Sequence, residues 1–347
     1  MKPIGKSKHL VILTIVIASC IILGSCSSSE SQDEPAWSDG GESYLTDPTD
    51  LSPLRLPEGE KLRVVATTSI VADVVSNVGG EAFELTTLMP ANVDPHSFEP
   101  TPADLRVVSE AHVVFINGLD LEEFIEEMLQ NVGGDVPVVS LSEGINALVL
   151  GEESDHGDKG DDVSDGEHRE GAFDPHVWLD PANVLIWVDR VVLTLSSLDP
   201  EKSSGYETNG QDYKEELLIL DDWIDEMVSK VPEEDRLLVT DHRVFEYFAV
   251  RYGFDIVGAV IPVFSSAAEP SAREIADLEE SIRDLNIKVI FVGVSINPSI
   301  VEAVVQDTGT QLVPLYTGSL SDEKGPAGNY IALMRYNVES IVSALVE

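Results

Sequence analysis

From about residue 61 onward, short apolar runs alternate along the chain with longer amphipathic segments. Short runs rich in Val, Ile and Leu are typical of buried strands, whereas apolar residues at intervals of three and four are typical of helices. The strands predicted in this way cover residues 62–67, 83–89, 112–116, 136–141, 236–240, 255–261, 288–292 and 311–315. Strands that alternate with helices predict parallel sheets with helices on both faces, so the fold class is α/β.

The middle of the chain breaks this alternation. Two helical patterns, 181–198 and 213–231, follow one another with no strand between them. In the second pattern, apolar residues from Leu217 to Met227 recur close to every 3.6 positions, which predicts an amphipathic helix. We therefore expect two α/β halves joined by a long helical segment.

The N-terminus has the pattern of an export signal. Three lysines precede an apolar run over residues 10–23, and "LGSC" follows, ending at Cys26. The run is short for a membrane-spanning helix but typical of a signal peptide. The order resembles the lipobox of bacterial lipoproteins, which predicts removal of residues 1–25 and lipidation of Cys26. An uncleaved anchor is the alternative, and both place the protein outside the cytoplasm at a membrane.

Two polar segments interrupt the apolar pattern. Residues 26–60 are rich in Ser, Asp, Glu, Pro and Gly, and we expect a disordered acidic tether there. Residues 151–171 form a second acidic segment with His156 and His168, which predicts an exposed loop. This loop either collects ions weakly or is only a solvated charged loop.

Charge and cysteine content exclude several classes of function. The chain has 63 acidic and 21 basic residues, a net charge of −42, which argues against nucleic acid as a partner and against binding to anionic lipid. The same charge suits the capture of cations or an adaptation to salt. Of the two cysteines, Cys20 lies in the predicted signal, so a mature chain has no internal disulfide and no cysteine-based zinc site.

Three histidines are candidate metal ligands. The tripeptide Asp-Pro-His occurs twice, at 94–96 and 174–176, and His242 follows the predicted strand 236–240. Ligands bind beyond the carboxyl ends of parallel strands, and neutral imidazoles suit zinc, with copper and nickel also possible. The neighbouring aspartates Asp94, Asp174 and Asp241 are predicted to accept hydrogen bonds from the imidazole rings.

Other interpretations of single residues remain open at this point. A histidine before a helix is more often a cap or a satisfied polar group than a ligand. His112 begins a predicted strand and is expected to be structural, and Trp178 is expected to pack in the core rather than to seal a site.

A resemblance to a known family adds to these expectations. The segments that carry it are "VVATTSIVADVVSNVGG", "DPHSFEPTPAD", "INGLDLEEF", "FDPHVWLDP", "VTDHRVFEYFAVRYG", "AEPSAREI" and "GPAGNYIALMRYNV", within residues 62–347. They resemble the zinc/manganese solute-binding lipoproteins of ABC importers. The resemblance implies two α/β lobes joined by a long rigid helix, with a metal site in the cleft between the lobes. It also implies His96, His176 and His242 as the metal ligands.

The resemblance implies an organisation and partners as well. The N-terminal lobe is expected at 61–200 with the acidic loop, the linker helix at 201–232 and the C-terminal lobe at 233–347. The partners are an ABC permease with its ATPase, and the membrane through the lipid anchor. The protein is then a monomer at the outer face of the bacterial cytoplasmic membrane, and it is not an enzyme.

Two departures from the family pattern concern the metal site. Gly318 stands where the family usually has an aspartate ligand, and Gly293 where it usually has a glutamate. A water, Asp322 or Glu269 is then expected to fill the fourth position.

Three histidines without that carboxylate favour Zn²⁺, and Mn²⁺ is the alternative. Two other functions are a zinc hydrolase with an open coordination position and a surface adhesin.

Overall fold

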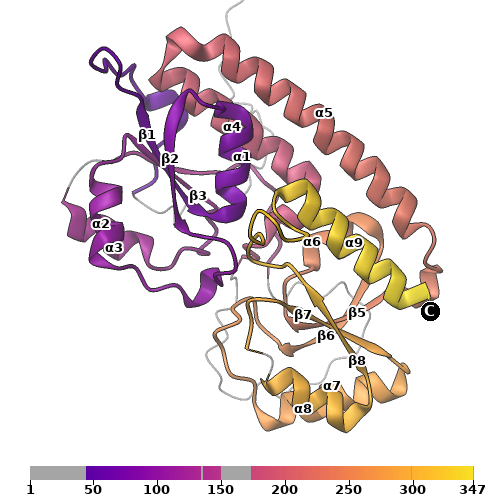
Figure 1. Cartoon of the computed structure of the whole chain (residues 1–347). Coiled ribbons are helices and arrows are strands. Elements are labelled where there is room, and N and C mark those ends of the chain that lie inside the picture. Colours follow the sequence, from indigo (N-terminus) through magenta and orange to yellow (C-terminus); the bar gives the residue numbers. More distant parts are fainter. Residues whose placement is uncertain (1–43, 134–135, 150–172, 298, 347) are drawn as a thin grey trace, which may run out of the picture. The chain divides into compact units, whose positions relative to one another are not determined.

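The computed structural model describes residues 44–133, 136–149, 173–297 and 299–346. Within them the chain forms two parallel four-stranded sheets, with strand orders β2-β1-β3-β4 and β6-β5-β7-β8 (Figure 1). Each sheet carries helices, so the predicted α/β fold with two parallel-sheet lobes is confirmed. All eight predicted strands are present, with small shifts at their ends.

The N-terminal lobe has one helical layer on each face of its sheet. Its strands are β1 (Leu62–Thr68), β2 (Phe83–Met89), β3 (Val113–Ile116) and β4 (Val138–Ser140), and its helices are α1 (Ser69–Gly79), α2 (Pro102–Ser109), α3 (Ile125–Val132) and α4 (Pro181–Leu198). Alternate residues of β1 point to opposite faces. Val64 and Ala66 join the core that includes α1 and α4, whereas Val65 joins the core beneath α2 and α3.

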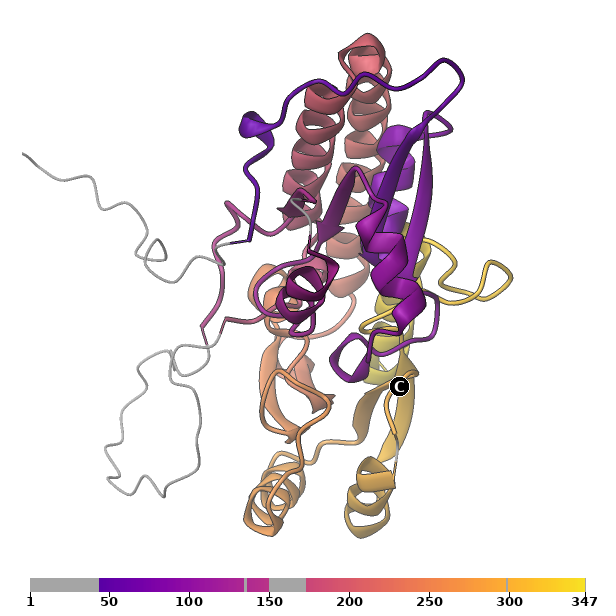
Figure 2. The ribbon, with the colours of Figure 1, turned by 90° about the vertical axis from the view of Figure 1, so that its left-hand side faces the viewer.

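The C-terminal lobe repeats this arrangement. Its strands are β5 (Leu237–His242), β6 (Asp255–Ile261), β7 (Val289–Gly293) and β8 (Gln311–Leu315), and its helices are α6 (Glu246–Tyr252), α7 (Ala272–Asp284), α8 (Ser299–Thr308) and α9 (Tyr330–Val346). Helices α7 and α8 pack against each other on one face of the sheet, over a core that includes Val239 and Ile290. Figure 2 shows both helices on the same side of the strands. The other face is covered by α6 and α9.

Helix α5 (Ser203–Val228) links the two lobes. Its 26 residues extend for about 39 Å at the rise of an α-helix. It packs against α1 and α4 of the first lobe and then against α9 of the second (Figure 1). Gly210 allows the close approach of α4, because a Cβ at this position would lie 2.5 Å from Val192 Cγ2. The expected long linker helix is thus present.

The segment before β1 differs from the expectation. Residues 26–60 were predicted to be a disordered tether, but the described part from Tyr44 onward lies on the N-terminal lobe. The backbone of Thr46 donates to Val138 O of β4 (2.7 Å), and that of Leu54 donates to Leu198 O (2.9 Å). Leu45, Leu51 and Leu56 pack against the core. The prediction is therefore wrong for residues 44–60, because scattered leucines bury apolar area while the backbone pairs with the exposed edge of β4.

Several predictions fall outside the described residues. These are the signal peptide 1–25, the lipidated Cys26, the first part of the tether and the acidic loop with His156 and His168.

Candidate metal site

Three imidazole rings meet where the two lobes face each other. His96 lies in the short 3₁₀ turn η2 (Pro95–Ser97) after β2, His176 directly precedes the turn η3 (Val177–Leu179), and His242 ends β5. The Nε2 atom of His176 lies 3.1 Å from that of His96 and 3.4 Å from that of His242. Ligand atoms of all three lie within 4.8 Å of one another. Zinc with Zn–N bonds of about 2.0–2.1 Å in a tetrahedron needs nitrogens roughly 3.3–3.4 Å apart, so this spacing suits such an ion.

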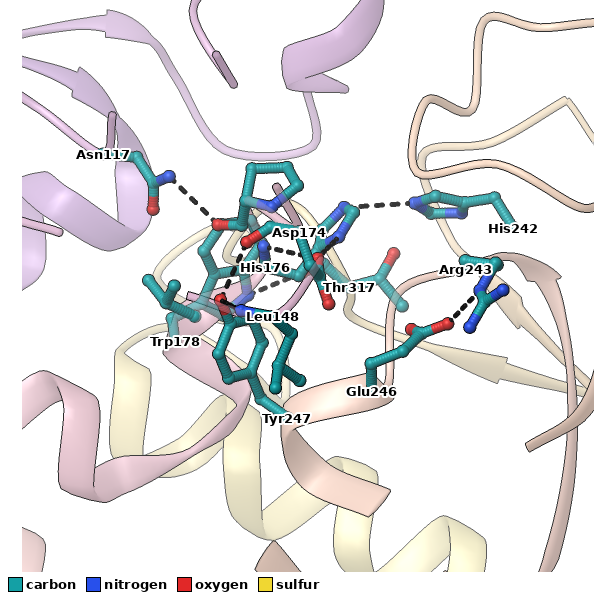
Figure 3. Close-up of polar contacts among 12 residues, drawn as sticks. Asn117, Leu148, Asp174, His176, Trp178, His242, Arg243, Glu246, Tyr247 and Thr317 are labelled. Atoms are coloured by element: carbon teal, nitrogen blue, oxygen red, sulfur yellow. Dashed lines mark hydrogen bonds and ion pairs between the residues drawn. The ribbon is translucent and has the colours of Figure 1, made fainter. Parts of the chain in front are cut away.

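His176 is the most firmly held of the three. Asp174 Oδ1 accepts from the backbone N–H of His176 (3.0 Å) and lies 2.7 Å from its ring Nδ1. The hydroxyl of Tyr247 donates to the carbonyl of Asp174 (3.0 Å), and the amide of Asn117 donates to the carbonyl of Pro175 (3.0 Å), as Figure 3 shows. The ring therefore has its Nδ1 occupied and its Nε2 directed at the other two histidines.

Asn117 is itself fixed by a strained turn. It follows β3, and the next three residues, Gly118, Leu119 and Asp120, all have positive φ. The buried carboxylate of Glu122 accepts from the backbone N–H groups of Asn117 (2.8 Å) and Gly118 (3.1 Å) and from Thr67 Oγ1 (2.5 Å). Strain of this kind persists only where the surroundings enforce it, and it gathers at functional sites.

His242 is held by its own neighbour. Asp241 Oδ1 accepts from the backbone N–H of His242 (3.0 Å) and lies 3.2 Å from its ring Nδ1. The other oxygen accepts from the backbone N–H of Gly293 (3.1 Å). A Cβ at Gly293 would overlap Thr317 Oγ1 and would lie only 3.3 Å from Asp241 Oδ2. A larger residue at 293 would therefore displace the group that orients His242.

His96 has a different kind of support. Asp94 Oδ1 accepts from the backbone N–H of His96 (3.2 Å), and Oδ2 accepts from the hydroxyl of Ser266 in the other lobe (2.7 Å). The expected bond from Asp94 to an imidazole ring is absent, so that prediction is wrong, whereas it is confirmed for Asp174 and Asp241. The reason is local: the carboxylate caps the turn η2 and its second oxygen faces the other lobe.

The electrostatics leave two of the rings neutral. Burial lowers the pKa of both His96 and His176 well below the ordinary 6.5, and the neighbouring histidines lower it further. Burial also lowers the pKa of His242, but the charge and hydrogen bond of Asp241 outweigh it, and the net shift is upward. Burial raises the pKa of Asp174 to about 8, and its Oδ2 has no partner among the described residues. The metal-free Asp174–His176 pair therefore shares a proton without being an ion pair.

The carboxylates expected at a fourth position do not reach the cluster. In the described part of the chain, the three histidines are the whole group of potential ligands. Both Asp322 and Glu269 are exposed and lie outside it, so the fourth position stays a prediction. Gly318 is packed against the turn η2, since a Cβ there would lie 2.8 Å from Pro95 Cδ.

His112 and Trp178 are structural, as predicted. His112 Nδ1 accepts from the backbone N–H of Arg63 (2.9 Å), and Trp178 is buried with its Nε1 donating to the carbonyl of Thr317 (2.9 Å).

Asn117, Tyr247 and Ser266 were not anticipated as residues that support the site. Asn117 directly follows a strand, so the rule that ligands bind at the carboxyl ends of strands could have found it. Tyr247 and Ser266 act through contacts between lobes, for which the sequence carries no local signal.

With this geometry established, similarity to known proteins defines the class. Residues 64–344 match the family model ZnuA, described as "Zinc-uptake complex component A periplasmic". The manganese-binding lipoprotein MntA of Halalkalibacterium halodurans is 35% identical over 289 residues, covering 83% of this chain and 90% of that protein. The manganese ABC transporter substrate-binding lipoprotein PsaA of Streptococcus pneumoniae is 30% identical, covering 98% of this chain and 100% of that protein.

Solved structures agree with these relatives. The periplasmic zinc-binding protein TroA from Treponema pallidum has a TM-score of 0.73 and 30% identity, covering 83% of this chain and 100% of that one. Fold and sequence together define a substrate-binding protein of the ABC transporter type, and the relatives named here are receptors, not enzymes. The chain belongs to the ZnuA family of metal-binding substrate-binding proteins.

Proposed function

We propose that this protein captures Zn²⁺ outside the cell and delivers it to an ABC importer, with His96, His176 and His242 as the ligands. The observation that carries the proposal is the cluster of three imidazoles whose Nε2 atoms face one another. A site with nitrogen ligands and no carboxylate among the described residues suits zinc better than the oxygen-preferring divalent ions.

Manganese is the second candidate, and the names of the relatives favour it. MntA and PsaA are both named for manganese, whereas TroA is named for zinc. Metal analysis after dialysis against equal concentrations of both ions distinguishes the two. A protein that retains manganese under this competition would contradict the zinc assignment but not the receptor function.

The partners and location follow from the same class. We infer an ABC permease and its ATPase as partners, with the receptor anchored as a monomer to the outer face of the bacterial cytoplasmic membrane through lipid on Cys26. The N-terminal lobe then comprises 61–200 together with the segment 44–60 that packs on it, the linker helix 201–232 and the C-terminal lobe 233–347. Labelling with a radioactive fatty acid, compared between the wild type and Cys26→Ala, tests the anchor.

Stoichiometry tests the ligands directly. Equilibrium dialysis should find one tightly bound zinc ion per chain, and Ala at position 96, 176 or 242 should abolish tight binding. His112→Ala is the matched control, because His112 accepts a structural hydrogen bond on the N-terminal lobe and should leave the stoichiometry unchanged. Unchanged zinc content in all three ligand variants would overturn the proposal.

A further inference from the structure

His96 differs from the other two histidines in how its ring is held. His176 and His242 each have an aspartate at Nδ1, whereas Asp94 contacts only the backbone of His96. His96 is also the one member of the cluster that is partly exposed, while His176 and His242 are 1% and 2% exposed. The position of its ring is therefore set by the turn that carries it.

That turn is attached to the opposite lobe at three points. The backbone N–H of Asn92 donates to the carbonyl of Leu320 (3.0 Å), and Ser266 Oγ donates to Asp94 Oδ2 (2.7 Å). Pro95 lies so close to Gly318 that a Cβ on the glycine would come within 2.8 Å of its Cδ.

The loop around Gly318 is held in place by two further bonds, both to residues of the N-terminal lobe. Trp178 Nε1 donates to the carbonyl of Thr317 (2.9 Å), and the backbone N–H of Leu320 donates to Ser69 Oγ (3.0 Å). The loop around Gly318 is therefore fixed on both sides of the glycine. A side chain at 318 could be accommodated only by moving Pro95 and, with it, His96.

We propose that Ser266 and Gly318 are positioning residues for His96, which latch the turn 92–96 onto the C-terminal lobe and thereby retain the bound metal. The inference rests on the proposed function, since it concerns retention of the same ion. Metal release then requires the Ser266–Asp94 bond and the Pro95–Gly318 contact to separate. Gly318 then has a steric role. A carboxylate side chain at this position would push Pro95 away, so the turn can pack against the loop around residue 318 only because a glycine stands there.

The first test measures release of zinc from the loaded protein to excess EDTA by stopped flow. Ser266→Ala removes a hydrogen bond to a charged acceptor and should speed dissociation by about tenfold. Ser266→Thr keeps the hydroxyl and should restore the wild-type rate. Ser265→Ala is the matched control, because its hydroxyl accepts only from Ala267 N–H within its own loop. The bond is present without metal, so Ser266→Ala should lower the melting temperature of the metal-free protein slightly. Restoration of the release rate by Ser266→Thr, with no change in zinc stoichiometry, is the readout that a merely structural role would not predict.

The second test uses Gly318. Gly318→Ala and Gly318→Asp should both weaken zinc binding, because either side chain displaces Pro95. Gly205→Ala is the control, since a Cβ at Gly205 in α5 meets nothing within 4 Å. If Asp at 318 acted as an added ligand, Gly318→Asp would bind zinc more tightly, and that result would overturn the latch.

The two proposals fail in different ways. Release at the wild-type rate from Ser266→Ala, with one zinc still bound per chain, contradicts the latch alone. A wild-type protein that binds neither zinc nor manganese contradicts the receptor function and the latch together.

Discussion

Asp94–His96 and Asp174–His176 share one tripeptide sequence and contribute to one cluster, yet their aspartates are used differently. Asp174 is fully buried and contacts the ring of its histidine, whereas Asp94 is partly exposed and contacts the other lobe through Ser266. The tripeptide Asp174–His176 is held by Asn117 of its own lobe, which donates to Pro175 O, and by Tyr247 of the C-terminal lobe, which donates to Asp174 O. The comparison shows that one motif can hold a histidine ring through its own aspartate in one place and leave the ring position to the turn and its contact with the other lobe in another.

Replacing the two aspartates should produce the largest contrast. Asp174→Asn replaces the carboxylate at the ring of His176 with a neutral, weaker acceptor and should lower zinc affinity by roughly 10–100-fold, the usual cost of changing such a partner. Asp94→Asn leaves an oxygen to cap the turn and should cost only several-fold, chiefly in the dissociation rate. Isothermal titration with a competing chelator gives the affinities.

Equal losses in the two asparagine variants would contradict the difference between the tripeptides. An equal loss of stability in the two metal-free variants would not contradict this difference, because the free energy of unfolding does not report on the orientation of the His176 ring.

Acid should release the metal through His242 before it protonates the histidine of either tripeptide. Zinc binding requires neutral imidazoles, and the pKa of His242 is raised above 6.5 while those of His96 and His176 are lowered. Affinity should therefore be constant above the pKa of His242 and fall about tenfold per pH unit below it, as one proton displaces the ion. Zinc affinity measured from about pH 8 to about pH 5 checks this. An initial slope of two or three protons would show that the histidines of the tripeptides protonate together with His242.

The smallest expected effect concerns the support of the buried tripeptide. Asn117→Ala removes the hydrogen bond to Pro175 and should weaken zinc binding by about fivefold, the value of a single neutral hydrogen bond. Asn209→Ala is the control, because its amide makes an equivalent bond to Val78 O, between α5 and α1. Both variants should lose similar stability, but only Asn117→Ala should lose affinity. NMR of the metal-free protein should show a broadened His176 ring in that variant alone.

Much of this arrangement could be predicted from the sequence. Periodicity placed all eight strands, because buried parallel strands are nearly continuous apolar runs. The rule for carboxyl ends of strands, together with the repeated tripeptide, selected His96, His176 and His242. The start of α5 at Ser203 could not be found in this way, since residues such as Glu207 and Gln211 are exposed on the helix and give no apolar pattern.

Other features depend on contacts that no local pattern encodes. Ser266 contacts Asp94, which lies more than 170 residues earlier in the chain. Gly318 contacts Pro95, which lies more than 220 residues earlier. The positive φ values at Leu119 and Asp120 are enforced by a buried glutamate rather than favoured by the residues themselves. Leu45 lies in an acidic segment whose average composition indicates disorder, so composition alone does not predict that this leucine packs on the lobe.

The attachment of the chain near Leu45 sets how far the receptor can move from the membrane. If lipid is carried on Cys26, only the 17 residues 27–43 separate it from the first described part of the lobe. Their greatest reach is about 60 Å, roughly half that of a tether continuing to residue 60. Halving a radius reduces the accessible volume about eightfold, which raises the local concentration of receptor at a permease in the same membrane. With the proposed anchor, the segment that packs against β4 would therefore affect how often the receptor meets the permease as well as the stability of the lobe.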